Sequence, residues 1–258
     1  MTHLMDLTGD SVVPKSWSRC ANQYGISPQD TRPIDARRDD ERHHLLRDEL
    51  LPVSRPELER LETVVGKSGH SIILTDPRGT ILSAASARPD QSDFKSAPLS
   101  VGQCWNDALR GTNAIGTCIA ERAPVLIHGN DHYVRAHHNL SCAAAPIFDE
   151  QHELLAVLDT STVNPDRDPT RALHTLAMVT ESARRIEKDW FRHRHQQDWT
   201  LEIQTASAGV ALYALNEALQ VIGLDATAHQ GLGLHQTWLG FALAEHLDRP
   251  SFEGLLDT

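Results

Sequence analysis

The segment that decides the fold opens with Trp105-Asn-Asp-Ala-Leu-Arg-Gly-Thr-Asn-Ala-Ile-Gly-Thr-Cys118. A histidine-rich stretch, 128–138, follows it, and the segment closes with Ser141-Cys-Ala-Ala-Ala-Pro-Ile-Phe-Asp149 and Ala156-Val-Leu-Asp-Thr160. Runs of small residues beside apolar runs allow the backbone to approach a small molecule closely. We therefore expect a ligand pocket within residues 102–160.

Working outward from this segment, two hairpins indicate the fold class. Residues 71–75 and 80–83 are short apolar strands around the turn Asp76-Pro-Arg-Gly79, where Pro fixes φ and Gly accepts a positive φ. The same pattern recurs at 143–148 and 154–159. Helices at 105–110 and 113–121 and a strand at 124–128 lie between the hairpins. We predict an α+β fold, with a mostly antiparallel sheet flanked by helices.

The N-terminal part of the chain is predicted to be helical. Val13-Pro-Lys-Ser-Trp-Ser-Arg-Cys20 indicates a short docking helix that ends near Gly25. The densely charged residues 35–62 follow, and their partial leucine stripe predicts helical structure. Pro52 and Pro56 should break this stretch into two helices, because proline lacks the backbone donor that a helix interior requires.

One long helix is predicted over residues 171–199, with apolar residues spaced by three and four. The spacing involves Leu176, Val179, Ala183, Ile186 and Trp190. The pattern lasts only about two heptads, so it fits either a helix that forms a homodimer or one that packs on its own domain. Beyond it, 209–215 and 219–224 predict another hairpin, and 225–231 a short helix.

Composition excludes several classes of protein. The chain has 258 residues and a formal net charge of -11, which argues against an extended contact with nucleic acid. It lacks an apolar run of about 18 residues and a basic N-terminal region, so we expect a cytoplasmic protein without a membrane span or a signal peptide. Four cysteines without a CxxC pair predict reduced thiols and no disulfide.

Two familiar ligand motifs fit poorly. Gly111-Thr-Asn-Ala-Ile-Gly-Thr117 lacks the lysine of a phosphate-binding loop, so nucleotide binding is not expected. Instead, Thr112 or Asn113 should cap a helix, whose first amides either face a small polar ligand or serve the cap alone. The histidines of 128–138 with Cys142 match no zinc ligand spacing, so we predict imidazoles that face solvent or line the pocket, and neither metal nor cofactor.

Asp159 ends an apolar strand and should be buried, which requires a partner such as Thr160, His132 or a ligand hydroxyl. Trp105 is either a core residue or a pocket wall. No catalytic triad, paired carboxylates or dinucleotide motif is visible, and no basic residue adjoins Cys118 or Cys142, so an enzyme is not expected. The candidate ligand-binding residues are Trp105, Thr112, Asn113, Thr117, Cys118, His132, Tyr133, Cys142 and Asp159.

Several of these motifs, in order, match one family. Ser16-Trp-Ser-Arg-Cys20, Gly111 to Thr117, Gly129-Asn-Asp-His-Tyr133 and Ser141 to Asp149 resemble the sensor region of sigma-54-dependent activators of the acetoin catabolism and dihydroxyacetone regulator type. The resemblance implies an N-terminal helical segment in residues 1–55, a GAF domain in 56–170, a signalling helix in 171–200 and a partial PAS-like domain in 201–258.

The resemblance also implies a function, namely the small-molecule-sensing region of a transcriptional activator. The effector would be acetoin, a diol, an alcohol or an aldehyde, and the 171–199 helix would form a homodimer. DNA and sigma-54 would be contacted only through an AAA+ ATPase and a DNA-binding module, which we expect outside this chain. Two alternatives stay open: a thiol-dependent enzyme similar to GAF-type methionine sulfoxide reductases, using Cys104, Cys118 and Cys142, or a protein-interaction module.

Overall fold

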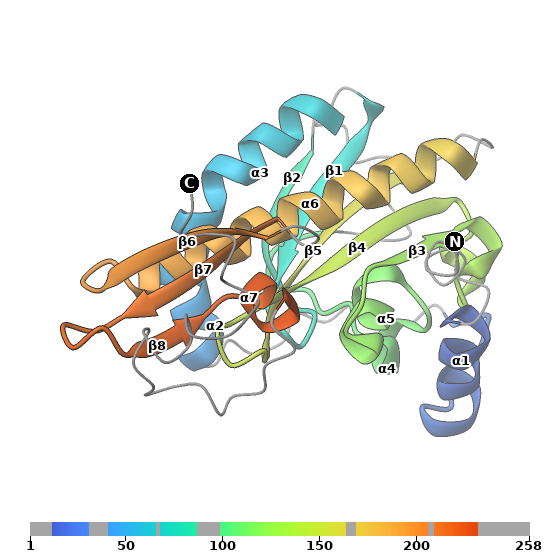
Figure 1. Cartoon of the computed structure of the whole chain (residues 1–258). Coiled ribbons are helices and arrows are strands. Elements are labelled where there is room, and N and C mark those ends of the chain that lie inside the picture. Colours follow the sequence, from blue (N-terminus) through green and yellow to red (C-terminus); the bar gives the residue numbers. More distant parts are fainter. Residues whose placement is uncertain are drawn as a thin grey trace. The chain divides into compact units, whose positions relative to one another are not determined.

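The computed structural model describes residues 12–30, 41–65, 68–86, 99–163, 169–205 and 209–231 (Figure 1). The chain divides into two compact units. The larger unit contains residues 1–147 and 154–186, and the smaller one contains 148–153 and 187–258. The PAS-like prediction for residues 232–258 lies outside the described residues.

A five-stranded sheet in the order β2-β1-β5-β4-β3 forms the centre of the larger unit. Its strands are β1 His70–Thr75, β2 Ile81–Ser86, β3 Val125–His128, β4 Leu140–Phe148 and β5 Leu154–Val163. The β1–β2, β1–β5 and β3–β4 pairs are antiparallel, which confirms the predicted sheet and both predicted hairpins. The central strand β5 is buried without interruption from 154 to 161, so both of its faces are covered.

The turn between β1 and β2 positions the stretch that begins at Trp105. Asp76 Oδ1 accepts hydrogen bonds from the amides of Arg78 and Thr80, both at 2.8 Å. Gly79 adopts a φ of +85°, and its carbonyl accepts a hydrogen bond from the Trp105 amide at 2.8 Å. A Cβ on Gly79 would lie 3.1 Å from the Asn106 nitrogen, so glycine permits this close approach.

Two short helices follow this contact, and each begins at an asparagine cap. Asn106 precedes α4 (Asp107–Arg110) and accepts a hydrogen bond from the Leu109 amide at 3.1 Å. Asn113 precedes α5 (Ala114–Glu121) and accepts one from the Gly116 amide at 3.0 Å. The predicted cap at Asn113 is confirmed, and α5 packs against β3 and β5.

The N-terminal part forms two helical runs. Helix α1 (Val12–Ser18) continues as a π-helical turn, η2 (Arg19–Gln23), and the run ends before Gly25, as predicted. The second run passes without interruption through α2 (Glu41–Leu45), η3 (Leu46–Leu50) and α3 (Leu51–Val65).

The expected break at Pro52 and Pro56 is therefore wrong, because Pro56 lies inside α3. Buried residues of α3, including Leu61 and Val65, add the packing that outweighs the local preference.

Helix α6 spans Pro169–Arg194 and is shorter than the predicted 171–199. A turn at 195–198 follows it, and Trp199 already belongs to a strand, because it pairs with Leu215. The residues of the apolar pattern, Leu176, Val179, Ala183, Ile186 and Trp190, are all buried within this chain. Their burial favours packing within the chain over the dimer alternative, and a homodimer through this helix stays a prediction.

The smaller unit contains a three-stranded sheet in the order β6-β7-β8. Its elements are β6 Trp199–Thr205, β7 Gly209–Leu215, β8 Val221–Leu224 and α7 Ala226–Gly231. The predicted β7–β8 hairpin and the final helix are confirmed, whereas β6 was not predicted as a strand. None of the described helices combines the length and apolarity that a bilayer crossing needs.

Candidate functional site

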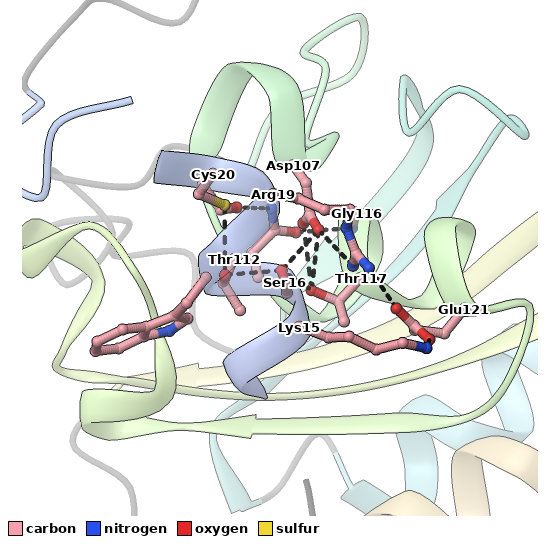
Figure 2. A network of polar contacts seen from close by, with 12 residues as sticks. Lys15, Ser16, Arg19, Cys20, Asp107, Thr112, Gly116, Thr117 and Glu121 are labelled. Atoms are coloured by element: carbon pink, nitrogen blue, oxygen red, sulfur yellow. Dashed lines mark hydrogen bonds and ion pairs between the residues drawn. The ribbon is translucent and has the colours of Figure 1, made fainter. Parts of the chain in front are cut away.

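The nine predicted ligand-binding residues lie in separate surroundings. Some of them contact the N-terminal segment, which we call the strap and define as residues 12–28. The strap is attached through a polar network, the strap network, drawn in Figure 2. We define this network as Ser16, Arg19, Cys20, Asp107, Thr112, Thr117 and Glu121.

Ser16 is the centre of the strap network and is completely buried. Its hydroxyl donates to Asp107 Oδ2 at 2.8 Å and lies 2.8 Å from Thr112 Oγ1 and 3.2 Å from Thr117 Oγ1 (Figure 2). Cys20 Sγ lies 3.5 Å from the same Thr112 oxygen. Thr112 and Thr117, which were predicted to bind a ligand, thus use their hydroxyls to hold the strap.

Asp107 links the strap to α5. Both of its oxygens accept hydrogen bonds from Thr117, at 3.2 and 3.3 Å, and Oδ2 also lies 3.4 Å from the guanidinium of Arg19. Burial raises the pKa of Asp107 to about 6, against the opposing effects of the Ser16 hydrogen bond and the Arg19 charge. A Cβ on Gly116 would lie 2.3 Å from the Asp107 nitrogen, so only glycine allows this approach.

Glu121, the last residue of α5, holds the outer part of the strap through ion pairs with Lys15 and Arg19. Burial alone would raise the pKa of Glu121, but the hydrogen bonds and charges of these two cations lower it. The Lys15 side chain is 67% exposed, whereas the Arg19 side chain is only 17% exposed. The Arg19 pair therefore contributes more to docking than the screened Lys15 pair.

The strap also contacts the loop between β3 and β4, residues 129–138, which contains the 3₁₀ turns η6 (Gly129–Asp131) and η7 (Arg135–His137). Trp17 Nε1 donates to the Asp131 carbonyl at 2.8 Å, and its ring packs edge-on against Tyr133 with centroids 5.6 Å apart. The predicted ligand-binding Tyr133 thus packs against the strap. An apolar cluster completes the contact, formed by Cys20, Ile26, Tyr133 and Val134.

Trp105 and His132 lie in a second group with His137, which was not predicted as a site residue. The ring centroids of Trp105 and His137 are 5.2 Å apart, and those of His137 and His132 are 6.3 Å apart. All three side chains are buried. Each has one buried nitrogen without a hydrogen-bond partner in the described part of the chain: Trp105 Nε1, His132 Nε2 and His137 Nδ1.

The protonation of His132 follows from its contacts. Its Nδ1 lies 3.0 Å from the Gly129 carbonyl, which can only accept, so Nδ1 must carry the hydrogen. Burial lowers the pKa of His132 to about 3, and therefore the ring is neutral at physiological pH. Its Nε2 is then a bare lone pair that needs a donor, and this nitrogen is the one without a partner.

Three further predicted residues, Cys118, Cys142 and Asp159, lie near Ser161, which was not predicted. We call these four residues the sheet-face cluster. Ser161 Oγ donates to Asp159 Oδ2 at 2.7 Å and lies 3.1 Å from Cys142 Sγ, whose S–H can donate in return. Asp159 Oδ1 has no partner among the described residues, although Asp159 is completely buried. The expected partners Thr160 and His132 do not bond it. Thr160 is adjacent to Asp159 in β5 and so points to the opposite face. His132 bonds the Gly129 carbonyl through Nδ1, and its Nε2 has no partner among the described residues.

Burial controls the electrostatics of the sheet-face cluster. It raises the pKa of Asp159 to about 7, and the Ser161 hydrogen bond only partly offsets this. Burial, followed by the nearby Asp159 carboxylate, raises the pKa of the Cys118 and Cys142 thiols well above the ordinary value. Both thiols are therefore protonated at neutral pH, which disfavours nucleophilic chemistry. No group of three metal-ligating side chains occurs within the described residues.

Ser161, His137 and Asp107 were not among the candidate ligand-binding residues, although His137 belongs to the histidines of 128–138 that were predicted to face solvent or line the pocket. A signal existed for Ser161, since it follows Asp159 by two positions in a strand and so shares its face. Asp107 carried no comparable signal, because its partner Ser16 lies 91 residues away in sequence.

Comparison with known proteins identifies the family. The model of the GAF domain matches residues 49–188, more than half of the chain, so the chain belongs to the GAF family. A solved structure with a similar fold is the E. coli DhaR(N)-DhaL complex, in which the similar chain has a TM-score of 0.59 and 16% identity. The match covers 91% of this chain and 81% of that one. These findings confirm the α+β GAF fold that the motifs indicated.

Two curated relatives are transcriptional regulators by name. The acetoin catabolism regulatory protein of Cupriavidus necator is 31% identical over 258 residues, 96% of this chain and 38% of the relative. The acetoin dehydrogenase operon transcriptional activator AcoR of Bacillus subtilis is 29% identical over 182 residues, 69% of this chain and 29% of the relative. The chain thus spans well under half of either relative's length.

Proposed function

We propose that this GAF-containing chain is the sensing region of a transcriptional regulator and that a small polar effector binds inside its GAF domain. The names of the curated relatives support the regulatory role. The raised pKa of Cys118 and Cys142 supports a role without thiol catalysis. As in the expectation from the motifs, the output would be control of an AAA+ ATPase and a DNA-binding module in the cytoplasm.

The observation that carries the proposal is a set of buried polar atoms without partners in the described chain. Asp159 Oδ1 and His132 Nε2 are acceptors that lack donors, and Trp105 Nε1 is a donor that lacks an acceptor. Each such buried group costs about 1 to 3 kcal/mol. A bound molecule that donates a hydroxyl hydrogen to Asp159 or His132, or offers an oxygen to Trp105, would recover part of this free energy, and a purely apolar one would not.

Acetoin is the first candidate, because both curated relatives are named after acetoin metabolism. It carries one hydroxyl donor and one carbonyl acceptor. Diols, simple alcohols and aldehydes are the other candidates. In this proposal Asp159 accepts from the effector, Ser161 keeps the carboxylate oriented, and Cys118 and Cys142 form the less polar part of the wall.

A second candidate function is recognition of a protein partner. The solved chain of similar fold was crystallised as a complex with DhaL, so a surface of the sensing region can carry such a contact in that protein. Effector binding predicts that a small molecule alone stabilises the chain against unfolding, whereas recognition of a protein partner does not.

Thermal unfolding with acetoin, butane-2,3-diol, ethanol and acetaldehyde tests the proposal. A ligand of the native state at 100 times its Kd should add about 2.7 kcal/mol of stability. Asp159→Asn should weaken binding about tenfold, because the carboxylate that accepts the effector hydroxyl is lost. Thr160→Val is the control, since Thr160 points to the opposite face of β5 and should leave binding unchanged.

The proposal fails if none of these compounds shifts unfolding. If one compound binds to wild type and to Asp159→Asn with the same affinity, Asp159 does not contact the effector, and the proposed binding site is wrong. Isothermal titration calorimetry of the two variants distinguishes these outcomes. The second candidate would be favoured if a protein co-purifies with the chain and none of the compounds shifts its thermal unfolding.

A further inference from the structure

The strap helps to attach the 129–138 loop to the rest of the unit. Most of its own hydrogen bonds are local, such as those from the His132, His137 and His138 amides to carbonyls three residues earlier. Two hydrogen bonds join it directly to the strap. Trp17 Nε1 bonds the Asp131 carbonyl at 2.8 Å, and the Arg135 amide donates to the Pro28 carbonyl at 2.9 Å.

One further bond joins the loop to the α4–α5 connection, from the Tyr133 amide to the Thr112 carbonyl. It is long, at 3.4 Å, and therefore weak. Thr112 is itself bonded to Ser16 of the strap. Hydrogen bonds thus join the loop to other segments at 131, 133 and 135, and the strap takes part in each either directly or through Thr112. The ring contact of His137 with Trp105 holds the loop without the strap.

The strap is suited to detach locally. Helices α1 and η2 comprise 7 and 5 residues, too short to be stable without docking. Their attachment consists of a compact polar network and a small apolar cluster. By contrast, the strands behind the sheet-face cluster are held by continuous ladders. Local opening should therefore occur at the strap and loop before it occurs in the sheet.

Access to the interior requires such an opening. His132 and Asp159 are completely buried, and Trp105 is 2% exposed, so no small molecule reaches their unpartnered atoms without movement of some segment. His132 lies between the two loop residues, Asp131 and Tyr133, that Trp17 contacts. Movement of the strap therefore releases the part of the loop that carries a buried acceptor.

We propose that the strap is a releasable fastener of the 129–138 loop, and that its detachment from Asp131, Tyr133 and Arg135 opens the interior of the GAF domain to small molecules. The proposal goes beyond the proposed function, which locates an effector but gives it no route. It adds a conformational device formed by the N-terminal segment.

Hydrogen exchange of the full chain, without ligand, tests the fastening. Trp17→Phe keeps an aromatic ring but removes the donor to Asp131, so peptides from 129–138 should exchange roughly tenfold faster while β5 is unchanged. Arg135→Pro is a second variant, which removes the amide that donates to Pro28 at the first position of η7, where proline fits a helical turn. Trp199→Phe, at a 68% exposed tryptophan, is the matched control.

Thiol modification tests the route. Methyl methanethiolsulfonate is small and neutral, and the rate at which it modifies Cys118 and Cys142 reports access to the interior. Both thiols should react several-fold faster in Trp17→Phe, whereas the buried Cys104, which bonds the Arg78 carbonyl, should not change.

Unchanged hydrogen exchange of the 129–138 loop in both variants would overturn the proposal. Equally faster exchange of the loop and β5, together with faster modification of Cys104, would also overturn it, because that result indicates a global loss of stability. Faster loop exchange with unchanged Cys118 and Cys142 modification would refute the route. None of these measurements uses an effector, so the outcome does not depend on whether one is found.

Discussion

Two buried aspartates of this domain have opposite surroundings. Both oxygens of Asp107 accept hydrogen bonds, from Ser16 and Thr117, and Arg19 supplies a nearby positive charge. Asp159 has one donor, Ser161, and its second oxygen has no partner among the described residues. Burial raises the pKa of both, to about 6 and about 7 respectively.

The difference separates a structural carboxylate from a candidate binding carboxylate. Asp107 receives its donors from elements up to 91 residues away and so holds the strap to α4 and α5. Asp159 keeps an acceptor unused at a cost that a fold would ordinarily avoid. A shifted pKa alone does not distinguish the two roles, whereas the partners of each oxygen do.

The largest expected effect comes from closing the space beside Asp107. In Gly116→Ala the new Cβ would lie 2.3 Å from the Asp107 nitrogen and 2.4 Å from its Oδ1. This clash with backbone should cost about 4 kcal/mol or more, despite the better helix propensity of alanine. Denaturant unfolding measures the loss. Gly25→Ala is the control, since it has a positive φ of +61° but no atom within 4 Å of the new Cβ, and an equal loss there would contradict the packing explanation.

Asp159→Asn should change the free energy of unfolding by less than Gly116→Ala, and at high pH it should stabilise the protein. Because the folded-state pKa of about 7 exceeds the ordinary 3.8, the folded state retains a proton that the unfolded state releases as pH rises. The wild-type free energy of unfolding should therefore fall between about pH 4 and pH 7, by on the order of 3 kcal/mol. In Asp159→Asn this fall should be absent, because asparagine does not titrate.

Thermal unfolding of wild type and Asp159→Asn at pH 4 and pH 8 checks the sign. The variant should gain stability relative to wild type at pH 8. A parallel pH dependence of the two proteins would show that Asp159 is paired in solution and would remove the contrast with Asp107.

The smallest of these effects is expected for Ser16→Ala, which removes one hydroxyl from the strap network. Hydrogen bonds to charged groups are worth about 2 kcal/mol, so a loss of roughly that size is expected in denaturant unfolding. Ser18→Ala on the same helix is the matched control, because Ser18 is exposed and bonds only to Asn22 in the described chain. Equal losses in the two variants would mean that Ser16 and its network do not hold the strap.

Much of the fold was predictable from local patterns. The turn Asp76 to Gly79, the two hairpins of the larger unit and the Asn113 cap were all predicted, because each depends on residues close in sequence. The break at Pro52 and Pro56 was wrong, since tertiary packing of α3 outweighed the proline penalty. The end of α6 was placed five residues too late, because the pairing of Trp199 with Leu215 is invisible in a local pattern.

The candidate site was predicted less well. Cys118, Cys142 and Asp159 lie near one another, and the hydrogen-bond partner of Asp159 is Ser161 and neither of the predicted residues. Their role as a ligand pocket stays a prediction. Thr112, Thr117 and Tyr133 instead contact the strap. These three were assigned by their place in the motif, and a motif does not show which side of a helix or loop meets another segment.

By itself the sequence determined the kind of elements, the GAF resemblance and the polar residues that a buried site could use. Periodicity, turn chemistry and caps act over a few residues, so they can be read along the chain. Only the tertiary structure decided which polar groups found partners, because Ser16 meets Asp107 and Trp17 meets Asp131 across about a hundred residues or more. The distinction between a satisfied carboxylate and an unsatisfied one therefore lies in the packing of distant segments.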